Sequence, residues 1–347
     1  MNKALIALPL AVLISACGSN GGGSSGGGAA SQLKIVGSST VYPFTTAVAE
    51  AFQRANAGTS VIVESTGTGS GIKLFCEGVG QQFPDMVNAS RPMKASEYED
   101  CAKAGAKNVI QVPIGIDGLT LIESNQAQPF KLTVRDIYAA LAATPFGKPQ
   151  TAQTWKDVNP SLPAIKIRVL GPPPTSGTRD SLAELILTKG CDSDPAMKAL
   201  KEQDSEKHKT VCTKIREDGA FVEAGENDNL MVQKVAVDPT AVGVLGYSFL
   251  AENADKVRPI ELGGVLPTEA TIQDLSYPGA RKLYLYVKGE HMSVKPAIKQ
   301  FLAAYAQAWG TGGLLEKRGL VPFAGADAQA ANAQASALKP LDPATLK

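Results

Sequence analysis

The sequence predicts a mixed α/β protein with two domains, and three observations support this fold class. Short apolar segments of strand length alternate with segments whose apolar residues recur at helical spacing. Several of these expected strands end in turns rich in serine, threonine and glycine. The chain of 347 residues is long enough for two domains of ordinary size. Its net charge is +1, and residues of both signs are spread along the chain. This does not favour nucleic-acid binding, which needs a basic face.

Residues 1–16 are typical of an export signal. Lys3 supplies a positive start, and the apolar residues 4–14 are too few to span a bilayer. Ile-Ser-Ala before Cys17 resembles the lipobox of bacterial lipoproteins, which implies cleavage before Cys17 and its lipidation; an ordinary signal peptide with a chance cysteine is the alternative. Residues 17–31 then form a flexible tether rich in Gly, Ser and Ala. We expect an exported protein, periplasmic or at the cell surface, that contacts the membrane only through this anchor.

The remaining cysteines indicate disulfides. Four cysteines are left after Cys17, and they allow three pairings. Closeness in sequence favours Cys76–Cys101 and Cys191–Cys212, each of which would contribute about 3 kcal/mol by restricting the unfolded chain. The chain has two histidines and no Cys-x-x-Cys motif, so it gives poor support for a zinc site or a Cys–His catalytic pair. We expect no metal and no other cofactor.

The first expected strand, residues 33–36, leads into a turn with Ser38, Ser39 and Thr40. A helix follows from Val41, with its apolar residues on one face. Backbone N–H groups at a helix start lack partners and the helix dipole is positive there, so this geometry suits an anion. The hydroxyls could simply cap the helix, but three in a row exceed what capping needs.

Two further strands end in similar turns. After residues 61–64 comes a Gly-rich turn with Thr68 and Ser70 as donors. Its Gly-x-Gly-x-Gly pattern is neither the dinucleotide fingerprint nor a nucleotide-hydrolase phosphate loop, which needs Gly-Lys-Ser/Thr. The strand 85–89 ends in Ser90 and Arg91, where the arginine forms either a surface salt bridge or an anion clamp.

The most informative turn, residues 171–180, follows the expected strand 166–170 and opens a helix. Ser176, Gly177 and Thr178 would present free N–H groups and two hydroxyls, and Arg179 could add positive charge. Ligand sites in open α/β sheets lie at the carboxyl ends of strands. The repeated turns therefore predict an anion site.

The rest of the chain supplies connecting elements. Residues 108–116 and 119–122, around Asp117 and Gly118, predict a strand that crosses between domains, and residues 282–287 a return crossing. We expect a buried strand at 241–247, a polar surface loop tied by a disulfide at 191–212, and a tail ordered only in part at 324–347. Helices are expected at residues 131–143, 195–203, 228–237, 293–309 and 313–317.

These motifs together resemble those of one family. The matching stretches are residues 36–43, 67–73, 88–92, 176–178 and 243–247, in order through most of the chain. They resemble the substrate-binding lipoproteins of bacterial high-affinity phosphate ABC transporters. The resemblance implies a two-lobed type II periplasmic binding protein of α/β class, with the ligand between lobes joined by two crossing strands. It places lobe one at 32–114 plus 281–322, lobe two at 115–280, and an Ala-rich tail at 323–347.

The resemblance implies that the protein captures inorganic phosphate without catalysis and delivers it, as a monomer, to an ABC transporter permease. The sequence departs from the family at one position. Many members carry an Asp there that accepts the phosphate proton, whereas this chain has Arg91. Arg91 would be the principal charge partner, and Asp117 and Asp180 are the candidate acceptors. The implied phosphate-binding residues are Ser39, Thr40, Val41, Thr68, Ser70, Ser90, Arg91, Ser176, Gly177 and Thr178, with Arg179, Asp180 and Asp117 as further candidates.

Two alternatives remain open. Hydroxyls, N–H groups and one arginine would also suit sulfate or another oxyanion, because sulfate has no proton to donate. A secreted phosphoesterase could use one of the clustered hydroxyls, although neither histidine lies near a hydroxyl-rich turn to act as its base.

Overall fold

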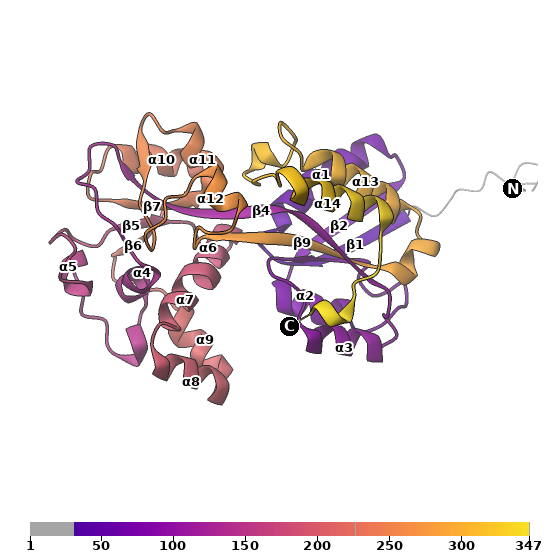
Figure 1. Cartoon of the computed structure of the whole chain (residues 1–347), viewed down its shortest axis with the longest axis horizontal. Helices are drawn as coiled ribbons and strands as arrows, with labels where there is room; N and C mark the ends of the chain where they lie inside the picture. The colour runs from indigo at the N-terminus through magenta and orange to yellow at the C-terminus, as the bar shows by residue number, and fades with distance from the viewer. Residues whose placement is uncertain (1–30, 226, 347) are drawn as a thin grey trace, which may run out of the picture.

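Two long antiparallel strands run between two α/β halves of the chain (Figure 1). The computed structural model describes residues 31–225 and 227–346. The two strands are β4 (Val109–Ser124) and β9 (Ala280–Lys288), and they pair directly with each other. They confirm the two crossings expected from the sequence and place residues from both halves side by side.

The first half is built on parallel strands from the N-terminal part of the chain. Its strand order is β2–β1–β3, and β3 pairs antiparallel with β9. Its elements are β1 (Ser31–Gly37), α1 (Tyr42–Ala55), β2 (Thr59–Ser65), α2 (Thr68–Phe75), β3 (Met86–Ala89), α3 (Ala95–Lys103), α13 (Ala297–Ala308) and α14 (Gly325–Ala337).

Apolar residues cover both faces of this sheet because successive strand side chains point to opposite sides. Leu33 and Ile35 are buried in a core with residues of α1 and α13, where the rings of Phe52 and Phe301 meet edge to face at 5.4 Å. Val36 is buried on the opposite face, in a core shared with α2. Burying each large side chain contributes about 1.5–3 kcal/mol. The two layers therefore hold the loops after β1, β2 and β3 in fixed positions.

The second half is built on β4, β7, β5 and β6, in that order. Strand β5 runs parallel to β6 and β7, whereas β7 and β8 pair antiparallel with β4. Its strands are β5 (Val169–Gly171), β6 (Phe221–Glu223), β7 (Val242–Gly246) and β8 (Val257–Pro259). Its helices are α4 (Val134–Leu141), α5 (Trp155–Val158), α6 (Gly177–Ser181), a π-helical turn (Leu182–Leu187), α7 (Thr188–Cys191), α8 (Pro195–Gln203), α9 (Ser205–Thr213), α10 (Asp228–Ala236), α11 (Tyr247–Glu252) and α12 (Glu269–Gln273).

Three expectations from the sequence are wrong. The polar segment 191–212 is not a surface loop, because α9 follows the expected helix at 195–203, which is α8. Residues 313–317 do not form a helix; only a short 3-10 turn, Glu316–Arg318, lies there. The Ala-rich tail forms α14, which buries Ala331 against the first half.

Both disulfides favoured by sequence separation are present, Cys76–Cys101 in the first half and Cys191–Cys212 in the second. The second one links the end of α7 to α9 and so fixes the helical excursion to its half. Among the described residues, no helix has both the length and the apolar character needed to cross a bilayer. The expected signal segment, Cys17 and the tether up to residue 30 lie outside the described residues.

Candidate functional site

The hydroxyl-rich turn at residues 38–40 and the start of α6 come from different halves and lie in direct contact. A Cβ atom added to Gly177 would lie 2.5 Å from the Ser39 carbonyl oxygen and 2.5 Å from the Thr40 Cα. Only glycine permits this approach of one backbone to another. Thr40 Oγ1 also donates to the Gly177 carbonyl over 3.1 Å. Two of the turns expected to bind an anion therefore meet between the halves.

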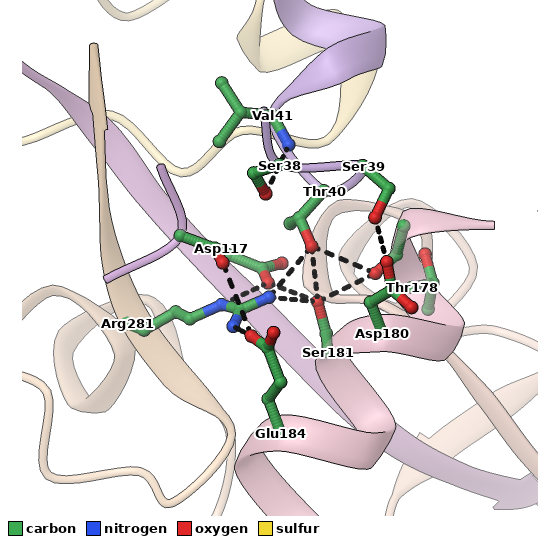
Figure 2. Close-up of polar contacts among 12 residues, drawn as sticks. Ser38, Ser39, Thr40, Val41, Asp117, Thr178, Asp180, Ser181, Glu184 and Arg281 are labelled. Atoms are coloured by element: carbon green, nitrogen blue, oxygen red, sulfur yellow. Dashed lines mark hydrogen bonds and ion pairs between the residues drawn. The ribbon is translucent and has the colours of Figure 1, made fainter. Parts of the chain in front are cut away.

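Arg281, at the start of β9, lies at the centre of the polar contacts between the halves (Figure 2). The residue is only 9% exposed. Its Nη2 donates to Thr40 Oγ1 and to Ser181 Oγ, each over 2.8 Å. Its Nη1 contacts the Glu184 carboxylate, and its Nε donates to Asp117 Oδ2 over 3.3 Å. A single guanidinium thus joins a first-half turn, a second-half helix and both crossing strands.

Asp117 is the partner of Arg281 in the pairing of β4 with β9. Its side chain is 15% exposed. Besides Arg281, it accepts a hydrogen bond from Ser181 Oγ over 2.7 Å. A buried charge is costly unless it is paired, so Asp117 compensates the charge of the guanidinium and holds it in place.

Asp180 is held against the first half. Its Oδ2 accepts from Ser39 Oγ, which brings together two residues singled out from the sequence. Burial raises the pKa of the Asp180 carboxyl, and the neighbouring charge of Glu184 raises it further, although Arg281 acts in the opposite direction. Asp180 is therefore a carboxyl group that holds a proton more readily than usual.

Backbone donors at the two helix starts are occupied locally. The Val41 N–H donates to Ser38 Oγ over 3.4 Å. Ser176 caps α6, and its Oγ accepts from the Thr178 N–H over 3.2 Å. An anion at these helix starts would have to replace these bonds.

The second and third turns are joined to each other within the first half. The Ser90 N–H donates to Thr68 Oγ1 over 3.1 Å, and the two hydroxyl oxygens lie 3.0 Å apart. Ser90 Oγ also donates to Glu184 Oε2 over 3.3 Å, which links this pair to the Arg281 network. Ser70, in α2, is exposed.

Arg91 makes its main contacts within its own half. Its two terminal nitrogens donate to the Glu97 carboxylate of α3 over 2.9 and 2.7 Å. These hydrogen bonds raise the pKa of Arg91. Arg91 is therefore already neutralised by a carboxylate, and Arg281 is the guanidinium that contacts both halves.

Arg179 also bonds away from this network. Its Nη1 donates to the Pro172 carbonyl over 3.0 Å and lies 3.7 Å from a Glu223 carboxylate oxygen. The guanidinium lies 4.5 Å from the centre of the Phe221 ring. These contacts hold the end of β6 against the turn after β5.

Two cavities lie on the elements that carry the network. The first, of about 320 Å³, is lined by Ser39, Thr40, Asp117, Ser176, Gly177, Thr178 and Asp228, among others. Burial raises the pKa of Asp228 to about 6. The second, of about 590 Å³, is lined by residues that include Ser90, Arg91, Glu184, Arg281 and Tyr284. Most of the predicted site residues therefore line one of the two spaces.

The histidines lie against carboxylates outside the network. His208 Nε2 lies 2.7 Å from Asp192 Oδ1, and His291 Nδ1 lies 2.6 Å from Asp85 Oδ1. The ligand atoms of His208, Cys191 and Cys212 lie within 4.8 Å of one another, but the two cysteine sulfurs are joined as a disulfide.

Three residues of the network were not singled out from the sequence: Arg281, Ser181 and Glu184. Ser181 is adjacent to Asp180 and Glu184 lies four residues after it, so all three belong to one helical segment, which sequence spacing alone could have indicated. The signal for Arg281 is weaker. It is an arginine within an otherwise mostly apolar strand, and such a residue needs a buried partner.

Comparison with known proteins identifies the family of the chain. A protein-family model described as a PBP superfamily domain matches residues 22–306. Protein SphX of Synechococcus elongatus is 31% identical over 335 residues, covering 93% of this chain and 86% of that protein. The phosphate-binding protein PstS of Staphylococcus saprophyticus is 30% identical, covering 85% of this chain and 82% of that protein.

Solved structures support the same fold. A possible phosphate-binding protein from Planctomyces limnophilus superposes with a TM-score of 0.70 at 25% identity, covering 88% of this chain and 98% of that one. PstS from Borrelia burgdorferi gives a TM-score of 0.56 at 20% identity over 85% of this chain and 99% of that one, and so supports the fold alone. The type II periplasmic binding-protein fold expected from the sequence is thus confirmed, and the chain belongs to the PBP superfamily, within the PstS and SphX family of phosphate-binding proteins.

Proposed function

We propose that this protein binds inorganic phosphate between its two halves and delivers it to the permease of an ABC transporter. The observation that carries the proposal is the buried Arg281, whose guanidinium already contacts hydroxyl groups from both halves. Relatives named as phosphate-binding proteins support the choice of anion. In this proposal the first half corresponds to residues 32–114 plus 281–322, the second to 115–280, and the tail to 323–347.

The donors proposed for phosphate come from every turn described above. They are Ser39, Thr40, Val41, Thr68, Ser70, Ser90, Arg91, Ser176, Gly177 and Thr178, to which we add Arg281. A buried anion must exchange its whole hydration shell for such donors. Each hydrogen bond that involves a charged group contributes about 1.5–3 kcal/mol net. A subset of these donors is therefore enough for micromolar binding, which corresponds to about −8 kcal/mol.

The charges around Arg281 favour a protonated anion. Asp117, Asp180 and Glu184 all lie within this network, so its carboxylates outnumber the one guanidinium at its centre. Sulfate would bring only lone pairs to these carboxylates, whereas hydrogen phosphate can donate its proton to one of them. Asp180 is the better acceptor of the two predicted from the sequence, because it accepts from Ser39, whereas Asp117 accepts from both Ser181 and Arg281.

The transport role needs export and a tether. We propose that residues 1–16 direct export and that lipidated Cys17 anchors the protein as a monomer through the segment 17–31. The two disulfides support an oxidising compartment outside the cytoplasm. Closure of the halves around phosphate would give the permease a surface that differs from that of the free protein.

Calorimetric titration of the purified mature protein, stripped of bound anions, tests the proposal. We expect saturable phosphate binding at neutral pH that persists in a large excess of sulfate. If sulfate abolished phosphate binding, the ligand of the protein would be oxyanions in general rather than phosphate. No heat with either anion would contradict the proposed function.

A further inference from the structure

Glu184 joins three parts of the molecule through one carboxylate group. It lies in the π-helical turn Leu182–Leu187 of the second half. Its Oε2 accepts from Ser90 Oγ, at the end of β3 in the first half, over 3.3 Å. The same oxygen contacts Arg281 Nη1 at the start of β9. A single side chain of the second half thus bonds to the first half and to a crossing strand.

The two groups that Glu184 contacts are donors of the kind that an oxyanion requires. Ser90 is 3% exposed and Arg281 is 9% exposed, so both would be costly to leave without an acceptor. The carboxylate oxygen of Glu184 meets this need from within the chain. In chemical terms, Glu184 stands where an oxygen of a bound anion could stand.

Glu184 borders solvent at the edge of the network. Its side chain is 52% exposed, in contrast to the buried Arg281 that it contacts. Both residues line the cavity of about 590 Å³ that also includes Arg91 and Thr188. The carboxylate can therefore rotate into solvent when an anion takes over its donors.

We propose that Glu184 is an internal competitor of phosphate, which holds the halves together without ligand and lowers the apparent affinity. This inference rests on the proposed function, because the displaced group competes for the same donors. The apparent affinity of a site falls by the fraction of molecules whose donors are free. If Glu184 occupies them in about nine of ten ligand-free molecules, removing its charge tightens phosphate binding on the order of tenfold.

The test compares Glu184→Gln with Glu202→Gln. The first removes the charge and keeps the shape of the side chain, and the second removes one exposed charge from α8 of the same half. Calorimetry should give phosphate binding on the order of tenfold tighter for Glu184→Gln and unchanged for Glu202→Gln. Equal or weaker binding by Glu184→Gln would overturn the proposal, since a residue that accepts the phosphate proton would behave in that way.

A second readout does not depend on phosphate. Glu184→Ala removes both contacts, so small-angle X-ray scattering of the ligand-free protein should show a larger radius of gyration than for the wild type. An unchanged radius would contradict the part of the proposal that has Glu184 holding the halves together. If the wild type binds no phosphate, the proposed function fails, and the scattering comparison still decides whether Glu184 joins the halves.

Discussion

Asp117 and Arg281 face each other on the two strands that cross between the halves, and the Arg281 Nε donates to Asp117 over 3.3 Å. The pair lies where both halves meet, so any change in the angle between the two halves changes the surroundings of the pair. Thr40 from one half and Ser181 from the other bond to the same guanidinium nitrogen. The guanidinium that we assign to phosphate binding is thus held by β4 and β9, the two strands about which the halves would move.

Replacing Arg281 by lysine should weaken phosphate binding by about 10- to 100-fold, which corresponds to about 1.4–2.7 kcal/mol. Lysine keeps the charge but loses the planar fork of donors that contacts Thr40, Ser181 and Glu184 together. Arg258→Lys is the matched control, since Arg258 pairs with Glu123 in the second half. Calorimetry of both variants measures the effect, and equal affinities would remove Arg281 from the site.

Arg91→Ala should have a smaller effect than the change at Arg281. Glu97 already binds the Arg91 guanidinium through both terminal nitrogens, so its charge is only partly available to an anion. We expect phosphate binding to weaken by less than about tenfold, that is by less than about 1.4 kcal/mol. A larger loss than for Arg281→Lys would make Arg91 the principal charge partner, as the sequence alone had indicated.

Gly177→Ala should separate the two turns that meet between the halves. The new Cβ would lie 2.5 Å from backbone atoms of Ser39 and Thr40, which cannot move aside as a flexible side chain could. We expect phosphate binding to fall at least tenfold, with a cost in stability of about 1–3 kcal/mol. Gly310→Ala is the control, because an added Cβ meets nothing within 4 Å there. Similar affinities of the two variants would show that the turns need not touch.

Asp180→Asn should reduce the preference for phosphate over sulfate. An amide cannot accept the phosphate proton as a carboxylate does, and removal of a negative charge favours the fully ionised sulfate. Competition calorimetry measures the ratio of the two affinities, with Asp255→Asn, at an exposed acid of the second half, as the control. An unchanged ratio would assign the acceptor role to another carboxylate.

Asp228 gives a prediction about pH. Burial raises the pKa of its carboxyl from 3.8 to about 6. A raised pKa means that the folded state favours the protonated carboxyl. The contribution of this group to stability is therefore fully present below pH 3.8 and is lost as pH rises towards 6. Asp228→Asn should therefore stabilise the protein at pH 7.5, on the order of 1–2 kcal/mol. At pH 4 the gain should be small. Thermal unfolding at both values measures it, and an equal gain at the two pH values would contradict the assignment.

The sequence was most informative where local chemistry decides the structure. The turns with Ser39–Thr40 and Ser176–Thr178 follow apolar strands, and their position is a consequence of the α/β fold itself. Arg281 was missed because its role depends on Asp117, which is its neighbour only through the pairing of two strands distant in sequence. Such a contact leaves no trace in spacing along the chain.

The tail shows the same limit for a whole element. Helix α14 has little amphipathic pattern and consists largely of alanine, so periodicity gave no reason to expect it to pack. Its order comes from tertiary contacts, such as the bond from Trp309 Nε1 to Asn332 Oδ1 over 3.0 Å. Helical stability in proteins comes mainly from such packing.

The most direct test of the central claim is a crystal structure of the protein bound to phosphate. We expect phosphate oxygens within hydrogen-bond distance of the Arg281 guanidinium and of the turn formed by Ser176, Gly177 and Thr178, with Glu184 turned away. Phosphate bound elsewhere, with no phosphate oxygen near Arg281 and with its guanidinium still in contact with Glu184, would contradict this claim.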